Sequence, residues 1–193
     1  DLQLRRQMQT ELKRLQTHLG ITFLYITHDQ EEALNMSDRI AVMRAGVFEQ
    51  VGSPAEIYDR PKTSYVAKFV GSANIIHGKA VSQNQDLISF STESGIGLVK
   101  HRDAIAPGKP VTVAVRRESI QLLAEEQGVE GLKAVVREKS FAGGLLQIIV
   151  SLNDGSELVA TKYGINSELK PGYRVLVTWN PENAVLVDVE GSI

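Results

Sequence analysis

The sequence predicts an α/β segment followed by an all-β domain of the small barrel or sandwich type. Residues 1–73 combine helical periodicity with a short, almost unbroken apolar run. Residues 74–193 instead show short β-type runs separated by turn residues, a pattern typical of β-barrels and sandwiches. We therefore predict a domain boundary between residues 73 and 74.

Residues 2–19 are expected to form an amphipathic helix, because apolar residues recur every three or four positions and share one face. They are Leu4, Met8, Leu12, Leu15 and Leu19. Gly20 follows as a stop signal. The next run, residues 21–27, is rich in β-formers and apolar almost throughout. Such a run predicts a strand covered by helices on both faces, as in a parallel sheet.

A second helix is expected directly after that strand. Thr27 is predicted as its N-cap, with Gln30 three residues later as in a capping box. Asp29, Glu31 and Glu32 fall in the first turn, where the helix dipole favours negative charge.

A hairpin is predicted over residues 39–51, with its turn at Ala45 and Gly46. Ser53, followed by Pro54, has the pattern of a further helix start. Strands are expected beyond the boundary wherever β-type residues alternate with turns. They cover residues 75–81, 87–90, 111–115, 132–136, 145–152, 157–161, 174–179 and 184–187.

The β part contains a weak internal repeat, in which a Pro-Gly turn, two Val, a Glu and a Leu recur at the same spacing. The copies are Pro107, Gly108, Val111, Val113, Glu118 and Leu122, then Pro171, Gly172, Val175, Val177, Glu182 and Leu186. Two related β modules packed together would explain the repeat. The alternative is that Pro-Gly turns before Val-rich strands are simply common.

Composition excludes several classes of function. The 193 residues carry a formal net charge of −2, which gives no basic footprint for nucleic acid. The absence of cysteine excludes disulfides and cysteine-ligated metal sites. No apolar run approaches the roughly 18 residues that span a bilayer. The chain begins at Asp1, already in helical pattern, which we interpret as part of something longer.

His28 is the main candidate for chemistry. It lies between the predicted strand and the predicted helix, at the sheet edge where α/β proteins bind ligands. A helix N-terminus suits a phosphate, and a neutral imidazole can donate one hydrogen bond to a phosphate oxygen. The alternative is an ordinary packed or capping histidine. His18, His77 and His101 have no partners at metal-ligand spacing, so no metal site is predicted.

The residues around His28 resemble the ATP-binding subunits of ABC importers. The matching runs are Ile-Thr-His-Asp-Gln-Glu-Glu-Ala at 26–33, Ser-Asp-Arg-Ile-Ala-Val-Met at 37–43 and Gln-Val-Gly-Ser-Pro-Ala-Glu-Ile-Tyr at 50–58. The resemblance is closest to the subgroup that serves sugars, polyamines, ferric iron and inorganic oxyanions. It implies that residues 1–73 are the C-terminal part of the nucleotide-binding domain. Residues 74–193 look like the accessory TOBE domain, a pair of OB-fold-like barrel modules.

Carried over residue by residue, this resemblance implies that His28 is the switch histidine that contacts the γ-phosphate during phosphoryl transfer. Asp1 falls in the loop that crosses the dimer interface, with a simple helix N-cap as the alternative. Asp29 and Gln30 are expected to be helix-start residues beside the site.

Other parts of an ATPase site are missing from this sequence. There is no Gly-x-x-x-x-Gly-Lys-Ser/Thr loop, which would cradle the phosphates, and neither a signature loop nor the catalytic Glu is recognisable. The resemblance therefore implies an ATPase that uses ATP and Mg²⁺ in the full-length subunit. This chain alone is expected to be inactive and to hold neither tightly.

The resemblance also implies partners: a second copy in a homodimer, membrane permease subunits and, indirectly, an extracytoplasmic solute-binding protein, but no nucleic acid. The location would be the cytoplasmic face of the cell membrane. A buried strand without its sheet neighbours would expose apolar surface, so self-association is expected. The alternative function is a stand-alone β module for regulation, ligand binding or dimerisation.

Overall fold

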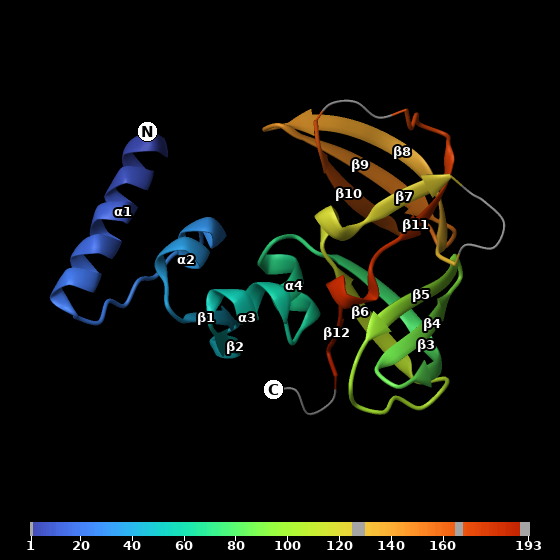
Figure 1. The fold of residues 1–193 in the computed structure, drawn as a ribbon, viewed down its shortest axis with the longest axis horizontal. Coiled ribbons are helices and arrows are strands. Elements are labelled where there is room, and N and C mark those ends of the chain that lie inside the picture. The colour runs from blue at the N-terminus through green and yellow to red at the C-terminus, as the bar shows by residue number, and fades with distance from the viewer. Residues whose placement is uncertain (1, 125–129, 165–167, 190–193) are drawn as a thin grey trace. The chain divides into compact units, whose positions relative to one another are not determined.

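The computed structural model describes residues 2–124, 130–164 and 168–189. It divides into two compact units, Asp1–Arg60 and Pro61–Ile193, which are described separately. The first unit follows the predicted pattern in most places (Figure 1). Its elements are α1 (Leu2–Leu19), α2 (Gln30–Met36), β1 (Ile40–Arg44), β2 (Val47–Gly52) and α3 (Pro54–Asp59).

The predicted local signals of the first unit are confirmed at both the hairpin and α3. Ala45 and Gly46 turn between β1 and β2 with positive φ values of 47° and 84°, the left-handed pair that a tight hairpin turn requires. Ser53 caps α3 in a capping box: its Oγ accepts from the Glu56 amide, and the Glu56 carboxylate accepts from the Ser53 amide. Two backbone donors are thereby satisfied at the start of the helix.

The predicted buried strand at residues 21–27 is wrong. These residues form an irregular connection between α1 and α2 (Figure 1). Leu24 and Ile26 are 91% and 89% exposed. A strand exists only through hydrogen bonds to a neighbouring strand. Among the described residues, β1 and β2 pair only with each other in their own sheet, so this run has no ladder to join.

The second unit begins with a short helix, α4 (Ser64–Phe69). Ala67 packs in a small apolar cluster with Ala73, Ala114 and Val187. Arg116 fixes the end of α4 by donating hydrogen bonds to the carbonyls of Ala67 and Val70. The boundary predicted between residues 73 and 74 therefore falls inside this unit, because α4 packs on the β-sheet that follows it.

In the described part of the second unit, ten strands make up one sheet. They are β3 (Asn74–Asn84), β4 (Leu87–Thr92), β5 (Gly95–Lys100), β6 (Pro110–Val115), β7 (Gln121–Ala124), β8 (Leu132–Ala142), β9 (Leu145–Leu152), β10 (Glu157–Tyr163), β11 (Arg174–Thr178) and β12 (Ala184–Val187). Two single 3₁₀ turns, η1 (Arg117–Ser119) and η2 (Pro181–Asn183), precede β7 and β12. The predicted all-β character is confirmed for the described residues from Asn74 to Val187, although β5 and β7 were not expected.

The internal repeat corresponds to two modules with the same order of elements. The first runs from β3 to β7 through η1, and the second runs from β8 to β12 through η2. A β-bulge follows Ala80 in β3 and Val136 in β8. The repeated Pro-Gly turns also bond alike: Gly108 donates to the Ala80 carbonyl at 2.7 Å, and Gly172 donates to the Val136 carbonyl at 2.8 Å.

The two modules exchange their last strands. β12 pairs with β6 of the first module, whereas β7 pairs with β11 of the second. Val113 lies opposite Leu186, and Val177 lies opposite Leu122. The repeat aligns Val113 with Val177 and Leu122 with Leu186, so the two pairings are one arrangement with the modules interchanged. The predicted duplication is confirmed by this register.

The core of the second unit is shared by both modules. Phe90 of the first module is fully buried, and its ring lies 6.4 Å from that of Trp179 in the second. The Trp179 indole N–H donates to the Leu98 carbonyl at 2.8 Å, so its polar atom is satisfied inside the core.

Candidate functional site around His28

His28 lies on the turn between the irregular segment 21–27 and α2, and its side chain is exposed. Asp29 and Gln30, the residues predicted beside it, are partly buried at the start of α2. Asp1 lies outside the described residues. The structure therefore brings three of the four predicted site residues together, at the N-terminus of one short helix.

The cap of α2 is Asp29, so the predicted Thr27 cap is wrong. An Asp29 carboxylate oxygen accepts from the amides of Glu31 and Glu32 at 3.0 and 3.2 Å. The Thr27 hydroxyl instead accepts a hydrogen bond from the Asp29 amide at 3.0 Å. A carboxylate acceptor also complements the helix dipole better than a hydroxyl. Asp29 therefore occupies two of the amides at the start of α2, and the side chain of His28 next to it is exposed.

A buried carboxylate, that of Glu32, accepts hydrogen bonds from the segment that leads into this turn. Glu32 of α2 is 3% exposed, and its two oxygens accept hydrogen bonds from both preceding segments. Oε1 contacts Arg5 Nε at 2.5 Å and Gln9 Nε2 at 2.7 Å, both from α1. Oε2 accepts from the Tyr25 hydroxyl at 3.0 Å and from the Thr27 hydroxyl at 2.7 Å.

These contacts keep Glu32 ionised. The Thr27 hydrogen bond, with further contributions from Tyr25 and Arg5, lowers the pKa of Glu32 and outweighs the opposing effect of burial. The separate hydrogen bond from the Tyr25 hydroxyl to Glu32 raises the pKa of Tyr25, because the carboxylate stabilises the protonated hydroxyl. The network thus stabilises a charged carboxylate beside neutral hydroxyl donors.

Sequence reasoning placed Glu32 among the first-turn acids of a helix and did not identify it as buried. Two adjacent glutamates follow Asp29, and nothing in their order distinguishes the exposed Glu31 from the buried Glu32. The one sequence feature that could have indicated a buried Glu32 is Thr27, whose hydroxyl lies five residues earlier and donates to its carboxylate.

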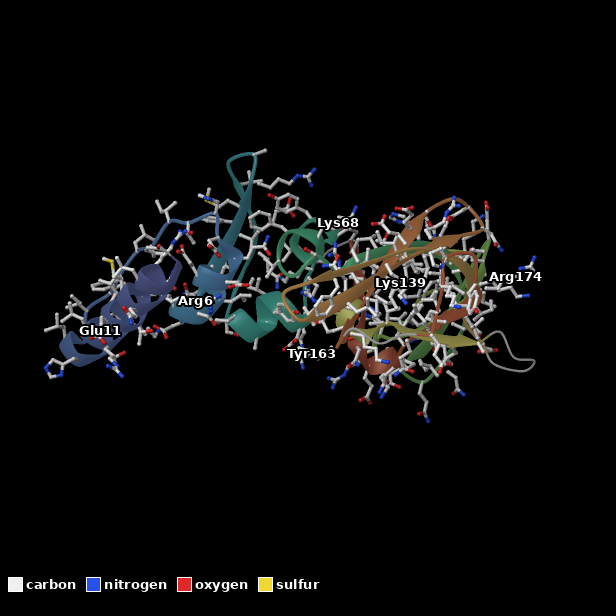
Figure 2. The ribbon with its side chains drawn as sticks, turned by 90° about the horizontal axis from the view of Figure 1, so that it is seen from above. Arg6, Glu11, Lys68, Lys139, Tyr163 and Arg174 are labelled. Carbon is white, nitrogen blue, oxygen red and sulfur yellow. The ribbon has the colours of Figure 1, made fainter. Side chains whose placement is uncertain are left out.

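α1 meets α2 through charges rather than through its apolar face. Lys13 contacts Asp38 just beyond α2 at 2.7 Å. Arg6, which is labelled in Figure 2, contacts Glu31 at 3.7 Å. The apolar stripe of α1 is largely solvent-exposed. Exposed pairs of this kind contribute about 0–1 kcal/mol each, so the buried Glu32 network is the more specific link between the helices.

No group of three or more metal-ligating side chains occurs within the described ranges. None of the helices described there combines the length and apolar character needed to cross a bilayer. A groove of about 960 Å³ in the second unit runs beside η1, β7 and β10 and contains none of the predicted site residues. Its lining is mixed, with Glu118, Lys162 and Glu168 around apolar side chains such as Ile148.

Comparison with known proteins extends the resemblance to nearly the whole chain. Residues 113–187 match the TOBE domain family. The chain is 38% identical over 187 residues to the spermidine/putrescine import ATP-binding protein PotA of Nitratidesulfovibrio vulgaris, covering 93% of this chain and 51% of that protein. It is 40% identical over 196 residues to PotA of Rubrobacter xylanophilus, covering 97% of this chain and 50% of that protein.

The chain is homologous to the ATP-binding subunits of ABC importers. It spans about half the length of the curated relatives it matches. The resemblance read from the residues around His28 is thereby confirmed, and the match to the TOBE domain covers residues 113–187 of the 74–193 predicted. A solved structure of the cytoplasmic molybdate-binding protein ModG is also similar, with a TM-score of 0.47 and 17% identity. That similarity covers 59% of this chain and 94% of ModG.

Proposed function

We propose that this chain is the part of an importer's ATP-hydrolysing subunit that carries the switch histidine and the accessory TOBE domain. The observation that carries the proposal is the 38–40% identity to import ATP-binding proteins over more than nine-tenths of the chain. The site geometry is consistent with it, because His28 is exposed on a turn held by Asp29 and Glu32.

In the full-length subunit, His28 would donate an imidazole N–H to the γ-phosphate of ATP and help to hold the attacking water in line. Phosphoryl transfer depends mainly on such positioning and on charge stabilisation. The sequence has no Gly-x-x-x-x-Gly-Lys-Ser/Thr loop, so other parts of the subunit would bind ATP and Mg²⁺. Asp1 would belong to the loop that meets the second subunit, with Asp29 and Gln30 beside the phosphate.

The assembled importer would contain two copies of this subunit on the cytoplasmic face of the membrane, bound to permease subunits and served by a solute-binding protein. Closure of the two copies around ATP would drive the permease between its two orientations. The relatives are named for spermidine and putrescine, so polyamines are the solute class to test first.

The test uses the full-length subunit in its assembled importer, with His28→Ala as the variant. We expect ATP turnover to fall about 100-fold, the size of loss that mispositioned reactants cause, while ATP affinity stays nearly unchanged. His18→Ala, an exposed histidine at the end of α1, is the matched control and should retain turnover. Normal turnover in the His28→Ala importer would refute the assignment.

A further inference from the structure

The Glu32 carboxylate accepts more hydrogen bonds than are required to hold α2 against α1. A buried ionised carboxylate is costly unless donors surround it, and Glu32 has four donors from two separate segments. Ion pairs from Arg6 and Lys13 already link α1 to α2 and to the residues that follow it. The additional donors, Tyr25 and Thr27, come from the segment that leads directly into His28.

The hydrogen bonds close a ring around His28. The Thr27 hydroxyl donates to Glu32 and at the same time accepts from the Asp29 amide. The Asp29 carboxylate then accepts from the Glu31 and Glu32 amides, which returns the ring to α2. Both neighbours of His28 in the chain are therefore fixed, and its side chain points out of the ring into solvent.

The other end of the network reaches the start of α1. Arg5 lies in the first turn of that helix and contacts Glu32 Oε1, and Gln9 contacts the same oxygen one turn later. A displacement of this end of α1 would thus be transmitted through one carboxylate to the His28 turn. α1 follows directly after Asp1, the residue proposed to belong to the loop that meets the second subunit.

We propose that Glu32 is a positioning residue for His28, acting through Thr27 and Asp29, and that Arg5 couples this position to the start of α1. This inference rests on the proposed function, since it assigns Glu32 a role only if His28 acts on ATP. Glu32 would not touch the nucleotide, because its two oxygens already face four donors of the protein. It sets the backbone from which the imidazole reaches the phosphate.

Tyr25 and Thr27 provide a matched pair of variants. Each donates one hydrogen bond to Glu32 Oε2, but only Thr27 also accepts from the Asp29 amide. A merely structural network predicts similar effects from Tyr25→Phe and Thr27→Val. The positioning role predicts that Thr27→Val lowers kcat about tenfold or more, since small displacements in a catalytic site have large effects.

The experiment measures kcat, KM for ATP, ATP affinity and thermal stability for these variants in the assembled full-length importer. Tyr25→Phe should stay within about twofold of the parent kcat, and Thr27→Ser, which keeps the hydroxyl, should restore turnover lost in Thr27→Val. ATP affinity should be unchanged throughout. Equal losses in Tyr25→Phe and Thr27→Val, or none in Thr27→Val, would overturn the inference.

A second measurement combines Glu32→Gln with His28→Ala. If Glu32 acts through His28, Glu32→Gln lowers turnover about tenfold in the parent and has no further effect in the His28→Ala background, because coupled residues are non-additive. An equal loss in both backgrounds would overturn the positioning role and leave the proposed function intact. Normal turnover in His28→Ala alone would instead refute the proposed function.

Discussion

The side chain of Asn74 hydrogen-bonds the backbone of β10, and removing this side chain gives a quantitative test of the fold. Its side chain is 7% exposed at the start of β3. The amide Oδ1 accepts from the Val159 N–H at 2.8 Å, and Nδ2 donates to the Val159 carbonyl at 2.9 Å. The side chain thus takes the place of a neighbouring strand beside β10, which lies at one end of the sheet order, and it links the first module to the second.

Asn74→Ala removes both hydrogen bonds. A typical net contribution is about 1 kcal/mol each, and a buried backbone group left without a partner costs about 1–3 kcal/mol more. Val159 is only partly buried, so water can replace some of the loss. We expect the free energy of unfolding to fall by about 3 kcal/mol, and the midpoint temperature by about 6–12 °C for a chain of this size.

Calorimetry and urea unfolding of the 193-residue chain measure this change. Asn84→Ala, at the exposed far end of the same strand, is the matched control and should change stability by less than about 0.5 kcal/mol. A loss below about 1 kcal/mol in Asn74→Ala would refute the idea that this amide substitutes for a neighbouring strand.

Two further changes test packing and charge. Gly97→Ala would place a Cβ 2.4 Å from the fully buried Phe90 ring, so urea unfolding should show a loss of about 1–3 kcal/mol, and an unchanged midpoint would contradict it. The Ser53 amide and hydroxyl lower the pKa of Glu56, so its contribution to stability is complete above pH 4.5 and is lost as pH falls through the lowered value. Urea unfolding of Glu56→Gln should therefore differ from the parent at pH 6 and converge with it in acid, and a constant difference would refute the assignment.

Local signals predicted the elements that form from their own residues. The Ser53 capping box and the Ala45–Gly46 turn involve contacts only a few residues apart, so the pattern of residue types was sufficient. The run at residues 21–27 failed for the opposite reason. Its apolar residues fit a buried strand, but a strand also needs a neighbour to pair with, and the described part of this chain supplies none for this run.

β5 was missed because its glycines resemble a turn. Gly97 lies where the Phe90 ring occupies the space of a side chain, so glycine here serves close packing rather than a change of direction. β7 is only four residues long and, within the described ranges, pairs only with β11. Neither strand can be predicted from its own residues, because β5 depends on the position of the Phe90 ring and β7 depends on its pairing with β11.

The candidate site shows the same division between local and distant contacts. The position of His28 at a helix start followed from the sequence, because the acidic first turn is a local signal, although the cap is Asp29 rather than the predicted Thr27. The role of Glu32 did not, because its partners Arg5 and Gln9 lie in a helix more than twenty residues away. The resemblance to a family pointed to His28, whereas the Glu32 carboxylate is identified only by the contacts seen in the structure.

The exchanged strands explain how a weak sequence repeat specifies one unit rather than two. Each module supplies the strand that completes the other: β7 covers the edge of β11, and β12 covers the edge of β6. An uncovered edge of this kind is a template for pairing with another chain. Exchange within the chain fills both edges at once, and the apolar core that follows, including the Phe90 and Trp179 rings, is shared. If one module unfolded alone, the other would expose the edge of a strand and part of the shared apolar core. The two modules should therefore unfold together.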